Sequence, residues 1–363
     1  MRQFKFWRKK LSAKSMLKLI VMVIAVGLIG AIGLPTQSDA RDLTVVSWGG
    51  SYQEAQRKAY FDPFMKLTGK KLLDESYNGE MAKIKAMVEA KDVTWDVVQV
   101  EAPELIDACD QGLLEIIDWK RLGGKEQFIP GAVMECGVGT IVWATVLAYD
   151  ADKIKGEGPK SWADFWNVKK WPGKRALRKS AKFSMEIALL ADGVKPEEIY
   201  KVLSTSEGVQ RAFKKLDEIK SYLQWWEAGA QPPQWLAAGD VVMTSVYNGR
   251  ITAAVKEGRN FKIAWNGQCY AIDSWVIPKG SPNLDLAYEF IKFSSQPQNQ
   301  AVSASMVPYG PTNIKAVAEV SPEVAPDLPT YPANLIGSVA IDSGWWVEHQ
   351  TELNERFNVW AAH

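Results

Sequence analysis

The side chains best suited to binding chemistry in this sequence are aromatic residues that follow its first apolar run. Residues 43–52 read LTVVSWGGSY, where a β-branched strand pattern ends in a Gly-rich turn carrying Trp48 and Tyr52. A strand, a turn and a helix in this order present ligand groups at the carboxyl end of the strand. The turn has neither a P-loop lysine nor the GxGxxG spacing. We therefore expect a pocket for a small organic solute, and the aromatic rings favour a cationic one.

A cationic amine bound in a dry cleft needs a carboxylate, because an unpaired buried cation is very costly. Aromatic faces attract it further, by roughly 0.5–2 kcal/mol each. Acids stand beside two predicted strands: Asp273 precedes one of them, while Glu101 follows the other and could add a second negative group. Tyr247 ends a third strand and offers an aromatic face. The alternatives are a turn or cap role for Asp273 and a solvated loop position for Glu101.

Other chemistries find little support in the residue types. The chain has only two histidines, His349 and His363, both near the C-terminus, and no GxSxG motif. It also lacks the adjacent tyrosines and the histidine cluster that iron capture would use. Anion or thiamine-type binding stays a weaker alternative, since strand-to-helix turns also hold phosphates. We expect no enzyme, no metal and no cofactor.

Residues 1–40 predict a secretory signal. Seven Lys and Arg residues precede an uncharged apolar run at 19–34, and the segment ends Ser38-Asp39-Ala40. The run is short for a membrane span, which needs about 20 residues, so we expect cleavage near Ala40 and a periplasmic protein. The chain has 43 Lys+Arg and 42 Asp+Glu; removing seven of the former and one of the latter leaves a net charge of −5. An acidic exported protein is a poor nucleic-acid binder.

The remaining chain is longer than a single core usually covers, which predicts two lobes. Its cysteines are Cys109, Cys136 and Cys269. In an oxidising compartment one pair could form a disulfide, and Cys109 with Cys136 is the closer pair in the sequence. Three buried thiols are the alternative. The spacings do not indicate a zinc site.

Helix and strand patterns alternate along the chain, which indicates an α/β fold with a mainly parallel sheet covered on both faces. Strands are expected at 43–46, 72–76, 95–100, 139–149, 241–247 and 274–278. Helices are expected at 54–68, 80–90, 103–111, 197–203, 208–226, 250–256, 284–294 and 297–304. Residues 162–166 open a second α/β unit.

Five short motifs in a fixed order resemble the periplasmic solute-binding proteins of ABC importers, in the spermidine/putrescine-binding branch. They are SWADFW at 161–166, YNG at 247–249, DSWVIP at 273–278, PYGPTN at 308–313 and SPEVA at 321–325. Each motif is short, but together they span most of the chain after the signal. The resemblance rests on their order and spacing.

The resemblance implies a two-lobed periplasmic binding protein of type II, in which each lobe is a mainly parallel sheet flanked by helices. Residues 41–146 plus 271–315 would form lobe 1, and residues 147–270 plus 316–363 would form lobe 2. The lobes would close over a ligand in the cleft by a hinge motion. A membrane permease would recognise the closed form. We expect a monomer.

The resemblance also assigns ligand contacts. Trp48 matches a ligand-contacting tryptophan, and both Tyr52 and Tyr309 match pocket aromatics. Tyr247 stands where the family usually has a tryptophan. Asp273 aligns with the carboxylate that binds the amine. These positions imply an aromatic pocket for an amine such as putrescine or spermidine.

One departure from the branch bears on specificity. Its members carry acids in the second lobe for the far amine, whereas residues 178–183 here read RKSAKF and are basic. Arg250, at a predicted helix start, could bind a carboxylate in bidentate fashion, and Arg178 is a second candidate. The alternative ligand is therefore an ω-amino acid such as γ-aminobutyrate, with its amine on Asp273. Both arginines are otherwise expected to be surface cations.

Overall fold

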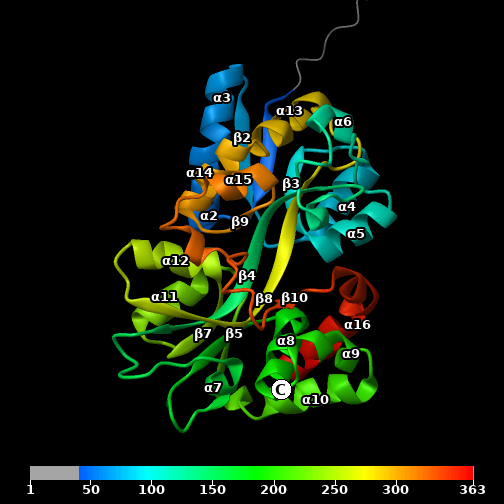
Figure 1. Ribbon diagram of the computed structural model, residues 1–363. Helices are drawn as coiled ribbons and strands as arrows, with labels where there is room; N and C mark the ends of the chain where they lie inside the picture. Colours follow the sequence, from blue (N-terminus) through cyan, green and yellow to red (C-terminus); the bar gives the residue numbers. More distant parts are fainter. Residues whose placement is uncertain (1–40, 363) are drawn as a thin grey trace, which may run out of the picture. The chain divides into compact units, whose positions relative to one another are not determined.

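One mixed β-sheet of ten strands organises the part of the chain that the structure describes, residues 41–362. The structure is a computed structural model (Figure 1). The strand order is β2-β1-β3-β8-β4-β7-β5-β6, with β9 (Gly310–Pro311) on β4 and β10 (Val339–Ala340) on β8. The expected export signal at residues 1–40 lies outside the described residues.

Three parallel strands form one end of the sheet, and we call them the first strand group. β1 (Leu43–Ser47) lies between β2 (Leu72–Ser76) and β3 (Val97–Glu101) and is parallel to both, as the prediction of a mainly parallel sheet requires. The helix expected at 54–68 is present, but a π-helical turn divides it. Its parts are α2 (Gly50–Gln56), the turn Arg57–Phe61 and α3 (Asp62–Thr68). The helix between β2 and β3 is α4 (Met81–Ala90).

Three more parallel strands form the other end of the sheet, the second strand group. They are β7 (Met243–Tyr247), β5 (Arg175–Arg178) and β6 (Leu223–Trp226). The prediction of one helix over 208–226 is wrong in its last part. Helix α10 ends at Asp217, and strand β6 follows. Trp226 is fully buried beside β5. A four-residue strand is too short for its periodicity to be separated from a helix.

Two long antiparallel strands join the groups. β4 (Val138–Asp150) pairs with β7, and β8 (Phe261–Val276) pairs with both β3 and β4. Figure 1 shows β4 and β8 running side by side between two sets of helices. The expected strand at 274–278 is only the end of β8. Each strand group is thus parallel, as expected, whereas β4 and β8 run antiparallel to each other, to β3 and to β7.

Helices cover both faces of the sheet. In β1, Val45 packs in a cluster with α3 and α13, whereas the next residue, Val46, packs in a cluster with α4 and α5. The helices near the first strand group are α5 (Ala102–Asp110), α6 (Trp119–Leu122), α13 (Leu284–Ser294), α14 (Pro297–Met306) and α15 (Ile314–Glu319). Those near the second strand group are α7 (Trp162–Trp166), α8 (Ala181–Ala191), α9 (Ile199–Leu203), α10 (Ser206–Asp217), α11 (Gln231–Ala238), α12 (Asn248–Lys256) and α16 (Ser343–Ala362). None of the helices in residues 41–362 is both long and apolar enough to cross a membrane.

The cysteine alternatives are resolved by a disulfide between Cys109 and Cys136, whose Cα atoms are 5.8 Å apart. It ties α5 to the segment that leads into β4. Cys269 is a free thiol buried in β8. Burial raises the pKa of this thiol well above its usual value, which is typical of an inert structural cysteine.

Candidate functional site

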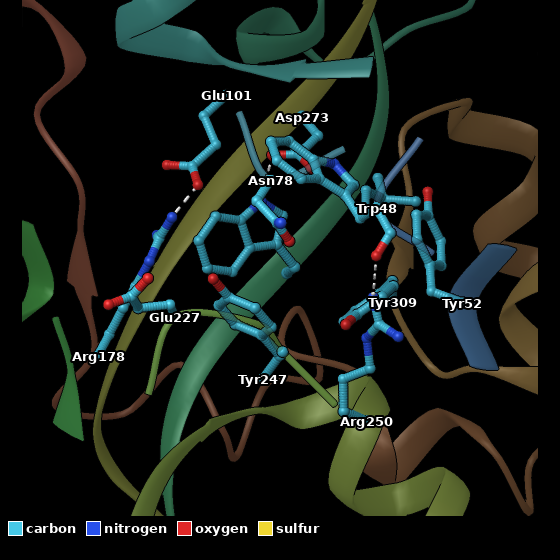
Figure 2. Close-up of a pocket in the computed structure, with 13 residues that line it drawn as sticks. Trp48, Tyr52, Asn78, Glu101, Arg178, Glu227, Tyr247, Arg250, Asp273 and Tyr309 are labelled. Carbon is cyan, nitrogen blue, oxygen red and sulfur yellow. Dashed lines mark hydrogen bonds and ion pairs between the residues drawn. The ribbon is translucent and has the colours of Figure 1, made fainter. Parts of the chain in front are cut away.

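All eight side chains that the sequence predicts as ligand contacts line one cavity (Figure 2). They are Trp48, Tyr52, Glu101, Arg178, Tyr247, Arg250, Asp273 and Tyr309. The cavity is completed by Asn78, Ile141, Trp143, Glu227 and Gly229. Its volume is about 40 Å³, roughly three times the 10–15 Å³ that one water molecule needs. It suits a solute of a few heavy atoms.

The cavity lies where strand ends of both groups meet. Trp48 directly follows β1, Glu101 ends β3, Arg178 ends β5 and Tyr247 ends β7. The carboxyl ends of parallel strands form the crevice in which α/β sheets bind ligands. Two parallel groups joined by antiparallel strands therefore direct these ends toward one space, with Asp273 on β8 between them.

Aromatic rings form the walls of the cavity. Trp48 stacks on Tyr77 with centroids 4.9 Å apart. Tyr52 meets Tyr309 edge to face at 5.1 Å. Tyr247 packs in the same manner against Trp143 and Trp226 at 5.0 and 5.1 Å. These contacts hold the rings in place, so the cavity offers preformed faces for a cation.

Asp273 is the buried acid of the cavity, with 3% of its surface exposed. It lies inside β8 rather than before a strand, which corrects the expected position. The indole Nε1 of Trp143 donates a hydrogen bond to Asp273 Oδ1 over 2.5 Å, and Gln99 Nε2 donates to Oδ2 over 3.4 Å. Burial and the nearby charge of Glu101 raise the pKa of Asp273 well above its usual value. This carboxyl lacks a cationic partner among the described side chains within 4 Å.

Glu101 is the second acid of the cavity, and cations compensate its charge. Lys182 Nζ lies 2.7 Å from Glu101 Oε2, and Arg178 Nη1 lies 3.1 Å from Oε1. Burial alone would raise the pKa of Glu101, but the two cations outweigh burial and lower it to about 2. The sequence suggested Glu101 as a second negative group, and the structure shows that this charge is already paired.

Arg250 is the cation of the cavity that lacks such compensation. It lies in the first turn of α12 and is 6% exposed. Its Nη2 donates to the backbone oxygen of Trp48 over 3.0 Å, while its Nε is buried without a partner. Within residues 41–362 it forms no ion pair with a carboxylate. Figure 2 shows Arg250 and the Arg178–Glu101 pair on different sides of the cavity. Burial raises the pKa of neighbouring Tyr309 to about 12, so this hydroxyl stays protonated.

Sequence reasoning missed Trp143 and Lys182. Trp143 lies in the apolar run of β4, where the sequence pattern does not separate a cavity residue from a core residue. Ile141, two positions earlier on the same face of the strand, lines the same cavity. Lys182 lies in the basic segment that the sequence analysis named, yet its contact with Glu101 depends on the folded position of α8. Among the described residues, no group of three or more His, Cys, Asp or Glu side chains could hold a metal.

The fold and this inter-strand cavity define a solute-binding protein of the two-lobed periplasmic type. Over residues 59–333 the chain matches the family described as bacterial extracellular solute-binding protein. The match covers more than half of the chain, and the protein belongs to this family.

Named relatives agree with this assignment. A Pseudomonas aeruginosa protein named gamma-aminobutyric acid-binding protein is 54% identical over 92% of this chain and 94% of its own length. The spermidine/putrescine-binding periplasmic protein of Escherichia coli is 22% identical over 87% of this chain and 90% of its own.

Solved structures show the same fold. One described as a GABA receptor has a TM-score of 0.79 and 38% identity, covering 88% of this chain and 97% of that chain. The PBP MotA from A. tumefaciens, in complex with glucopine, has a TM-score of 0.83 and 32% identity, covering 88% and 99%.

Proposed function

We propose that this protein is the ligand-binding subunit of an ABC importer and that its cavity binds an ω-amino acid such as γ-aminobutyrate. The observation that carries this proposal is that a buried acid, Asp273, and a buried cation, Arg250, line the same cavity and have no ion-pair partners in the described chain. A zwitterion whose ammonium and carboxylate groups are separated supplies an ionic partner for both side chains.

The amine end of the ligand would bind at Asp273. An alkylammonium there would pair with the carboxylate that Trp143 already orients by its hydrogen bond. The rings of Trp48 and Tyr247 line the same space and would attract the cation through their faces. Without a ligand, burial disfavours the charged form of this carboxyl, which agrees with its raised pKa.

The carboxylate end would bind at Arg250. The guanidinium donates Nη2 to the Trp48 carbonyl, while its buried Nε has no partner and could donate to an anion. Such a pair can be bidentate, which fixes both the position and the orientation of the ligand. Arg178 is less available, because Glu101 already occupies it.

A polyamine is the second candidate ligand. Glu101 and Glu227 also line the cavity, and acids of this kind favour a second ammonium group. However, Glu101 is paired with Arg178 and Lys182, and Glu227 pairs with Lys179 at the surface. The volume of about 40 Å³ also favours a short ligand over spermidine. The relatives include proteins named for both ligand classes.

The remaining expectations belong to the same proposal. Residues 41–146 plus 271–315 and residues 147–270 plus 316–363 would be the lobes, and a hinge motion between them would open the cavity. The protein would be exported with cleavage near Ala40, act as a monomer without enzymatic activity or cofactor, and deliver its ligand to a membrane permease.

A thermal-unfolding screen tests the proposal. A ligand at 100 times its Kd adds about 2.7 kcal/mol to the free energy of unfolding. We expect γ-aminobutyrate to raise the melting temperature at lower concentration than putrescine, spermidine or thiamine. A larger response to a diamine would favour the second candidate, and a response to none of them would contradict both.

A further inference from the structure

Four charged side chains form a largely buried ion network at one side of the cavity. Glu101 and Glu104 come from β3 and α5, next to the first strand group, and Arg178 and Lys182 come from β5 and α8, next to the second. Lys182 Nζ lies 2.7 Å from Glu101 Oε2 and 2.9 Å from Glu104 Oε1, and Arg178 Nη1 lies 3.1 Å from Glu101 Oε1. The side chains of Lys182 and Glu101 are 6% and 8% exposed. Two acids thus meet two cations, with Glu101 and Lys182 buried and Glu104 and Arg178 partly exposed.

The backbone at the start of α8 is distorted where it supplies this network. Lys182 has φ −58° and ψ 132°, and Phe183 has φ 74° and ψ −41°. Positive φ is strained for a bulky residue and persists only where the surroundings fix it. The distortion places Lys182 against the acids and places the Phe183 ring 5.1 Å from that of Trp143, whose indole holds Asp273. The network and the amine-binding acid are therefore in physical contact through two rings.

The network decides how many free negative charges the cavity presents. With Glu101 neutralised, Asp273 is the buried acid left for a ligand cation. If Glu101 were uncompensated, the cavity would hold two acids, paired directly across β3 and β8, and would suit a dication. A buried charge without a partner is costly, so the number of free acids sets the number of ligand ammonium groups that are tolerated.

We propose that Lys182, together with Arg178, determines the specificity of this cavity by neutralising Glu101, so that a molecule with one ammonium group is accepted and a diamine is rejected. This inference rests on the proposed function. Lys182 acts without lining the cavity itself, as a positioning and charge-compensating residue. A short amino acid and a diamine of equal length are the ligand classes that it separates.

The test is isothermal titration of Lys182→Met with γ-aminobutyrate and with putrescine. We expect the ratio of putrescine affinity to γ-aminobutyrate affinity to rise at least tenfold over that of the unchanged protein. The matched control is Lys215→Met, because Lys215 also lies between two acids, 3.7 Å from Asp192 and 2.7 Å from Glu218, but outside the cavity. This control should leave the ratio unchanged. An unchanged ratio in Lys182→Met overturns the inference.

A second variant separates charge from packing. Adding Glu101→Gln to Lys182→Met removes the freed acid, so the ratio should return toward its original value, whereas a purely structural defect would persist. Lys182→Gln serves the same test if the Met variant does not fold. If the unchanged protein prefers putrescine, the proposed function fails. If it prefers γ-aminobutyrate and the variant ratio does not move, only this inference fails.

Discussion

Glu101 and Asp273 are directly paired across antiparallel β3 and β8, yet the pKa values of their carboxyl groups are shifted in opposite directions. Lys182 and Arg178 outweigh the effect of burial and lower the pKa of Glu101 to about 2. Burial and the charge of Glu101 raise the pKa of Asp273. Like charges facing each other across a sheet are destabilising. The protein meets this conflict by pairing Glu101 with two cations, while Asp273, whose charged form burial disfavours, has no cationic partner among the described side chains.

Asp273→Asn should abolish amine binding without unfolding the protein. The folded state raises the pKa of Asp273 above its unfolded value, so the ligand-free protein loses stability as the pH rises from the unfolded pKa through the folded one. Removing the acid should therefore raise the free energy of unfolding at neutral pH. Urea unfolding and calorimetry check both effects. The control is Asp285→Asn, an exposed acid paired with Arg121. Full affinity in Asp273→Asn would remove this residue from the site.

Ligand binding should release protons from the protein. Above the usual pKa of an aspartate and below its raised folded value, Asp273 is partly protonated, and an arriving ammonium group favours the charged form. Affinity should rise with pH in this window. Titration in buffers of different ionisation enthalpy measures the number of protons released. Affinity that falls as the pH rises would contradict the account.

Glu101→Gln should destabilise the protein at neutral pH by about 3–5 kcal/mol, because it leaves buried cations without their main partner. The folded pKa of about 2 lies below the unfolded value. The stabilisation is therefore present above the unfolded pKa and is lost as the pH falls toward 2. The difference between the unchanged protein and the variant should shrink over this range in denaturant titrations. A difference independent of pH would show that the loss comes from packing.

Arg250→Met should weaken γ-aminobutyrate far more than putrescine. Truncating one partner of a buried charge pair costs about 2–5 kcal/mol, or at least about 30-fold in affinity. Arg250→Lys keeps the charge but not the bidentate geometry. Its affinity for γ-aminobutyrate should therefore lie between that of the unchanged protein and that of Arg250→Met. Calorimetric titration of each variant with both ligands measures these affinities. Equal losses for the two ligands would argue against a carboxylate at this position.

The cavity residues Trp48, Glu101 and Tyr247 could be predicted because they stand at strand ends, whereas Tyr52, Tyr309 and Asp273 were assigned through the family resemblance. Trp48 and Tyr247 each follow a β-branched run, and this local pattern fixes where they point. The ion network could not be predicted, since Glu101 and Lys182 meet only after two distant strand groups are joined by β4 and β8. The first half of β8 was also missed, because its residues do not alternate strictly between apolar and polar and its middle carries Asn266-Gly267, a pair typical of turns.

The most direct measurement is calorimetric titration of the purified protein with γ-aminobutyrate, butylamine and butyrate. The two monofunctional molecules each lack one end of the amino acid, so each leaves Arg250 or Asp273 buried without its partner. We predict that γ-aminobutyrate binds at least about 30-fold more tightly than either of them. Butylamine binding as tightly as γ-aminobutyrate would contradict the account.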